Sequence, residues 1–146
     1  MQNLGLVGLP WIASHPIAYP ALEVLHIAGI ALLLGSLVLL ELRVWGLSAE
    51  LPMAALARLS IAVSVSGFAL IAGSGLLMFA ANPAELLSNS AFLLKLGLVT
   101  LAGVNALVFH GRGGLQRCDA VARAQTLVST ALWIAAIICG RWIAYQ

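Results

Sequence analysis

Few side chains in this sequence can do chemistry, and the histidines are the first candidates. His26 lies near the start of an apolar stretch that runs from Ala21 to Leu40. Lys95 lies near the start of another apolar stretch, and His110 lies at its end. An ionisable side chain inside a bilayer is costly, so by default it is a candidate functional residue whose partner must be found. An imidazole also supplies a metal-binding nitrogen, which makes His26 a candidate ligand.

The composition indicates that membrane-spanning helices position these residues. Of the 146 residues, 62% are hydrophobic and 8% are charged, and the mean hydropathy is +1.07. A soluble domain of this length could not bury so much apolar surface. In hydrocarbon, backbone polar groups must pair within their own segment, and the sequence lacks the alternating pattern of a membrane barrel. We therefore predict an all-α polytopic membrane protein, a four-transmembrane-helix bundle that forms one domain over residues 1–146.

Each span needs about 20 apolar residues to cross a core of roughly 30 Å, so four spans fill this chain. They are predicted at about 20–42, 56–80, 91–110 and 121–145. Asn82-Pro83 closes the second span, and Trp142 and Tyr145 are typical of an interface at the end of the fourth. Residues 1–19 lack a basic start and a small-residue cleavage site, so we expect a short segment at the outer membrane interface, not a cleaved signal peptide.

The basic residues predict the orientation in the membrane. Five of them flank the first and third loops: Arg43, Arg58, Arg112, Arg117 and Arg123. Lys95 and Arg141 belong to the other side, so by the positive-inside rule these loops face the cytoplasm and both termini lie outside. Glu41 and Glu50 lie among the arginines, and we expect them to join a solvated cytoplasmic rim. No basic patch with interleaved aromatic residues indicates nucleic-acid binding.

Depth in the membrane decides which of the candidate side chains can meet. At a rise of 1.5 Å per residue, His26 lies about 8 Å and Lys95 about 6 Å below the outer ends of their spans. His110 lies about 28 Å from the outer side by the same arithmetic. We therefore predict an outer group of His26, Lys95 and Glu23, which His15 can join if the prolines fold its segment back. His110 is predicted to lie apart, at the inner side.

The outer group has the residue types that a b-type haem needs. Such a haem requires an axial imidazole nitrogen, flat apolar walls and room between helices. We predict His26 as the metal ligand, with Lys95 or His15 as second ligand or propionate partner. Gly29, one turn after His26, would give the macrocycle clearance. Glu23 could orient the imidazole or pair with the counter-cation of a propionate.

Ordinary structural roles are left open for the same residues. His26 could be a buried hydrogen-bonding residue, Lys95 could extend its amine towards water, and His110 could be an interfacial residue. A stripe of small residues on the second span could contact the edge of a porphyrin, but it favours close helix packing, within the chain or in a homo-oligomer. Its members are Ser60, Ser64, Gly67, Ile71 and Ser74.

Two segments resemble the HemJ/CopD-like family of small membrane proteins. Residues 23–37 read Glu-Val-Leu-His-Ile-Ala-Gly-Ile-Ala-Leu-Leu-Leu-Gly-Ser-Leu, and this run is similar to the family's first helix. Residues 91–99, with a lysine at 95, and the later Phe109-His110 resemble the family's other marked helix. The resemblance implies a four-helix protein of the bacterial inner (plasma) membrane. It also implies that His26 and Lys95 bind haem b, as the matching residues do in HemJ-type protoporphyrinogen oxidases.

Four functions are compatible with these observations. The favoured hypothesis is a haem-b protein that transfers electrons to or from a quinone or a periplasmic partner in a lipid membrane. The second is a HemJ-like protoporphyrinogen oxidase, so whether the chain is an enzyme stays open. The third is a CopD-like copper-handling protein, which the scarcity of Met/His clusters disfavours. The fourth is a structural membrane subunit without a cofactor.

Overall fold

The computed structural model describes residues 8–145, and within them it is all-helical. The four long helices are α2 (Ala18–Val44), α3 (Met53–Ala81), α5 (Ser90–Gly111) and α7 (Ala120–Trp142). The short elements are α1 (Pro10–Ser14), α4 (Pro83–Ser88), α6 (Gly114–Arg117) and the 3₁₀ turn η1 (Ile143–Tyr145). The four long helices are each apolar and long enough to cross a membrane, the last of them counted together with η1. The prediction of an all-α, four-helix, multi-pass membrane protein is confirmed.

The helices begin and end where the sequence chemistry places their boundaries. Asn89 caps α5, because its side chain accepts a hydrogen bond from Phe92 N at 3.1 Å. Asp119 caps α7 in the same way, with Ala122 N at 2.8 Å. Such caps satisfy amide groups that have no partner within the helix. Each long helix starts and stops within three residues of its predicted span.

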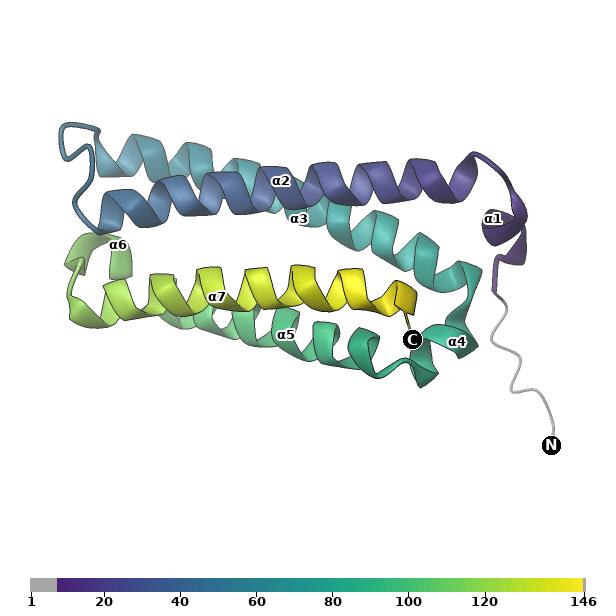
Figure 1. The fold of residues 1–146 in the computed structure, drawn as a ribbon. Coiled ribbons are helices and arrows are strands. Elements are labelled where there is room, and N and C mark those ends of the chain that lie inside the picture. Colours follow the sequence, from purple (N-terminus) through teal and green to yellow (C-terminus); the bar gives the residue numbers. More distant parts are fainter. Residues whose placement is uncertain (1–7, 146) are drawn as a thin grey trace.

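The bundle consists of two helical hairpins, α2 against α3 and α5 against α7 (Figure 1). In the first hairpin the small-residue stripe of α3 faces α2. A Cβ atom added at Gly67 would lie only 2.7 Å from Gly29 O, and one added at Gly29 would lie 2.8 Å from Gly67 O. Gly29 was expected to leave room for a macrocycle. The structure gives it a different role, because the backbone of α3 fills the space beside it.

The two hairpins pack on each other at the end of the bundle that carries the α2–α3 and α5–α7 connections. Val44, Phe109 and Ala122 form a buried cluster there. Trp45 adds a polar link, since its Nε1 donates to Thr126 Oγ1 of α7 at 2.9 Å. This end of the bundle is closed by side-chain contacts.

The N-terminal segment packs against the opposite end, where α1 lies beside the end of α3 (Figure 1). Leu9 N donates to Ala80 O at 2.6 Å, and Ile12 is buried. Trp11 remains exposed. Residues 1–7 of the predicted interfacial segment lie outside the described part of the chain. That the segment lies at a membrane interface stays a prediction.

Candidate functional site

A cavity of about 600 Å³ lies between the two hairpins, at the end of the bundle where α1 and η1 lie. All four long helices contribute to its wall, which is mainly apolar. The ionisable residues along it are Tyr19, Glu23, His26, Glu85, Lys95 and Arg141. Small-molecule sites in proteins typically have volumes of about 300–1,000 Å³ and a few polar groups that fix orientation. The cavity has the size and the lining of such a site.

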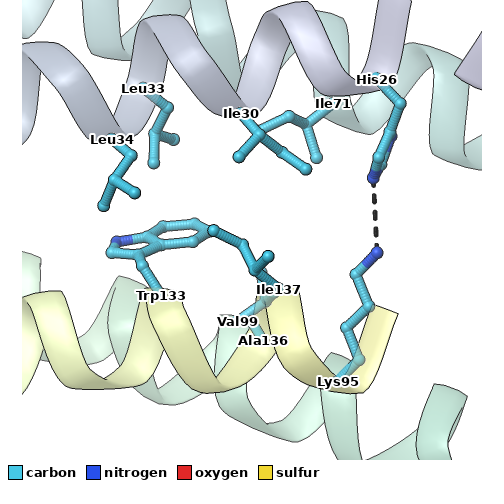
Figure 2. Close-up of a pocket in the computed structure, with 10 residues that line it drawn as sticks. All are labelled: His26, Ile30, Leu33, Leu34, Ile71, Lys95, Val99, Trp133, Ala136 and Ile137. Carbon is cyan, nitrogen blue, oxygen red and sulfur yellow. Dashed lines mark hydrogen bonds between the residues drawn. The ribbon is translucent and has the colours of Figure 1, made fainter. Parts of the chain in front are cut away.

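His26 and Lys95 face each other across the gap between the hairpins. The two nitrogens, His26 Nε2 and Lys95 Nζ, are 3.3 Å apart. Figure 2 shows the two side chains pointing toward each other. The same pair also borders a smaller apolar void of about 30 Å³, deeper in the bundle, next to Trp133. The equal depth predicted from the helix rise therefore corresponds to a direct contact in the structure.

Ser74 of α3 fixes the direction of the hydrogen bond at Nδ1 of the His26 ring. Its Oγ lies 2.9 Å from His26 Nδ1 and 2.5 Å from Leu70 O. A hydroxyl has one proton, and the short distance to the Leu70 carbonyl assigns that proton to this bond. Ser74 Oγ therefore accepts from Nδ1–H of the imidazole. In the neutral ring the lone pair is then on Nε2, the nitrogen that faces Lys95.

Glu23 lines the same cavity but does not orient the imidazole. Both ring nitrogens of His26 have other partners, Ser74 on one side and Lys95 on the other. Glu23 is exposed, one turn before His26 on α2. Its place on the cavity wall leaves it available to a polar group of a bound ligand.

His15 does not join the cavity. Its Nδ1 accepts hydrogen bonds from the backbone amides of Ile17 and Ala18, both at 3.2 Å. These amides lie at the start of α2, where helix N–H groups lack internal partners. The proline-rich segment thus places His15 at the start of α2, and not beside the ring of His26.

His110 lies apart from the cavity, as the depth arithmetic predicts. It is fifteen residues after Lys95 on the same helix, which is about 22 Å along the axis. Its ring packs edge-on against Phe109, with the ring centroids 5.2 Å apart. His110 is an exposed residue at the closed end of the bundle.

Three features of the cavity were not identified from the sequence. Ser74 was predicted only as part of a stripe for helix packing or a porphyrin edge, because the sequence does not say that the stripe of α3 faces His26. Phe79 and Phe92 stack at 5.8 Å between centroids and form a flat part of the wall. Arg141 lines the rim, where its Nη2 donates to Tyr145 OH at 2.9 Å. Apolar and basic residues at span ends are common, so none of these gave a distinctive signal.

Within residues 8–145 no group of three or more His, Cys, Asp or Glu side chains is placed to hold a metal ion. Of the cavity's lining residues, His26 is the one that supplies an imidazole nitrogen. This donor set fits a metal that brings most of its ligands with it, as the iron of a haem does.

No family model matches this chain, and no curated protein or solved structure matches it. The resemblance to HemJ/CopD-like proteins therefore stays a prediction.

Proposed function

We propose that this protein binds a b-type haem in the cavity between the hairpins, where His26 Nε2 would hold the iron, and that it transfers electrons in the membrane. The main support is the hydrogen bond between His26 Nδ1 and Ser74, because it leaves the lone pair on the nitrogen that faces the cavity. Histidines that bind metals usually donate their other N–H to a neighbouring acceptor in this way.

The residues around His26 fit the shape of a flat macrocycle. Stacked Phe79 and Phe92 and the isoleucines at 27, 30 and 137 supply apolar walls. Arg141 at the rim is suited to pair with a propionate. Lys95 Nζ lies 3.3 Å from Nε2, so a bound iron would displace the amine. The long side chain of Lys95 then either supplies the second ligand or reaches a propionate.

A bound haem would supply one-electron chemistry. The side chains of this protein would set its potential, since the apolar wall excludes water and Ser74 strengthens the imidazole as a donor. A quinone in the lipid phase or a redox protein outside the membrane is the proposed electron partner. The pairing of His26 with Lys95 also supports the proposed relationship to HemJ-type proteins, and rescue of a strain that lacks protoporphyrinogen oxidase would test that enzymatic version.

The proposed location is the inner membrane of a bacterium, with both termini and the cavity towards the outside. The bias of arginines towards the closed end of the bundle supports this orientation. With Cys118 and Cys139 replaced by serine, a single cysteine introduced at Glu50, in the α2–α3 loop, should react with a membrane-impermeant reagent only after the cells are opened. Labelling in intact cells would reverse the orientation.

The haem is tested by purifying the chain in detergent after expression with ample haem. We expect a b-type absorption spectrum in the oxidised and the dithionite-reduced protein. His26→Ala should lose it, whereas the matched controls His15→Ala and His110→Ala should keep it, because neither residue lines the cavity. A His26→Ala protein with its full haem content would refute the proposal, and a colourless wild type would favour a cofactor-free membrane subunit.

A further inference from the structure

A second buried ionisable group lies far from the cavity, on the last turns of α2. Glu41 was expected in a solvated rim, but only 9% of it is exposed. Its Oε2 accepts a hydrogen bond from Thr130 Oγ1 of α7, and the neighbouring Ser129 hydroxyl also interacts with the carboxyl group. Its Oε1 is buried and makes no hydrogen bond. The carboxyl group is enclosed between two helices and only partly satisfied.

The arginines near Glu41 have other partners. Arg43 donates to Leu51 O at 3.0 Å and to Ala49 O at 3.1 Å. Arg123 of α7 lies over the ring of Trp45, 5.8 Å from its centroid. Arg58, the charged residue of α3, is exposed. Within residues 8–145 the salt bridge of the structure joins Arg112 to Asp119. Among these residues, the carboxyl group of Glu41 therefore has no cation that would balance a negative charge.

A buried carboxylate without a cation is very unfavourable, and such a group holds a proton instead. A hard metal cation is a poor alternative ligand, because Ca²⁺ or Mg²⁺ requires six or more oxygen ligands. One carboxyl group and the hydroxyls of Ser129 and Thr130 fall short of that number. The ligand that suits these groups is a proton.

We propose that Glu41 is a proton-binding site inside the membrane, protonated at neutral pH and in exchange with water at the closed end of the bundle. The hydroxyls of α7 indicate the route. Thr126 lies one turn from Thr130, towards the start of α7, and it joins the indole of Trp45, which is partly exposed. Polar side chains therefore lie on successive turns of α7 between the buried carboxyl and the end of the bundle.

The site is separate from the proposed haem cavity. Glu41 follows His26 by fifteen residues on the same helix, which is about 22 Å along the axis. The proton site can therefore be tested in protein without haem, and its failure would say nothing about haem binding.

The test is infrared spectroscopy of the full-length protein with ¹³C-labelled glutamate, at neutral pH in lipid. We expect a carbonyl band of a protonated carboxylic acid that shifts in D₂O as the proton exchanges. Glu41→Gln should remove the band. Glu50→Gln is the matched control, an exposed glutamate in the adjoining loop, and it should leave the band unchanged.

A wild-type spectrum without the band, or a band that survives in Glu41→Gln, would overturn the proposal. A band that does not shift in D₂O would overturn the exchange with water. Thr130→Val covers the case in which Glu41→Gln does not fold. It keeps the carboxyl group but removes the hydroxyl that donates to it, so the band should move to higher frequency, and an unmoved band would count against the site.

Discussion

At the scale of single residues, one serine decides what His26 can do. If the lone pair of the His26 ring faced Ser74 on α3, the imidazole would have only a structural role as a hydrogen-bond acceptor. Here the Ser74 hydroxyl donates a hydrogen bond to Leu70 O, so its oxygen must accept a hydrogen bond from Nδ1 of His26. The other nitrogen then presents its lone pair to Lys95 and the cavity. The chemistry of the candidate site depends on this hydroxyl as much as on the histidine.

Ser74→Ala should weaken haem binding about 10- to 100-fold, the usual loss when the group behind a metal-binding histidine is removed. Haem titration of the purified protein, followed by absorbance, measures the affinity. Ser66→Ala is the control on the same helix, because the Ser66 hydroxyl is exposed and bonds only to Ala62 O. Equal affinities for the Ser74 and Ser66 variants would mean that Ser74 does not position the imidazole.

At the scale of helices, the contact between α2 and α3 depends on two glycines. Gly29 and Gly67 lie so close that a Cβ atom at either one would fall within 3 Å of a backbone oxygen of the other helix. The nearest atoms are backbone atoms, which cannot move aside as the end of a flexible side chain can. This contact brings Ser74 of α3 up to His26 of α2. The small-residue stripe therefore serves the cavity indirectly, by setting the distance between the two helices.

Gly67→Ala should destabilise the protein by about 1–3 kcal/mol, the usual cost of forcing extra volume into a packed contact. Gly73→Ala is the control on the same helix, because nothing lies within 4 Å of a Cβ added there. Its higher helix propensity should raise the stability, by up to about 1 kcal/mol. Denaturant titration in mixed micelles measures both changes, and equal effects would contradict the proposed role of the contact.

The start of α7 should make stability depend on pH in acid. Asp119 caps the helix through Ala122 N at 2.8 Å, and Arg112 Nη2 lies 3.3 Å from Oδ2. The hydrogen bond from Ala122, with Arg112 and Arg117, lowers the pKa of Asp119 below its ordinary value of 3.8. A lowered pKa means that folding favours the carboxylate. Its stabilisation is fully present above pH 3.8 and is lost as the pH falls through the lower pKa of the folded protein.

Thermal unfolding as a function of pH measures this acid transition. Asp119→Asn keeps an oxygen that can accept from Ala122 N but has no titrating group, so its unfolding temperature should vary less below pH 3.8 than that of the wild type. The same acid dependence in both proteins would assign the transition to other carboxyl groups.

At the scale of the whole molecule, the two hairpins are joined at one end and separated by the cavity at the other. Val44, Phe109 and Ala122, with the links from Glu41 and Trp45 to α7, close the first end. Only 11–17% of the most apolar window of each spanning helix is buried within the chain. The remaining apolar surface requires lipid, or another copy of the chain, around it. The bundle thus presents apolar surface on its outside, with a ligand-sized cavity at one end and a buried carboxyl group near the other.

The sequence by itself determined the helices, their boundaries and the levels of His26, Lys95 and His110 along the bundle. Hydrocarbon forces the backbone into helices, and a constant rise per residue converts residue number into depth. This is why His26 and Lys95 could be placed at one level and His110 at another.

Only the tertiary structure decided which side of each helix faces a neighbour. Lipid-facing and protein-facing residues in these spans are both apolar, so the sequence pattern does not reveal the rotation of a helix about its axis. The partnership of Ser74 with His26, the close contact at Gly29, the capping role of His15 and the burial of Glu41 all depend on that rotation and on the packing of the two hairpins.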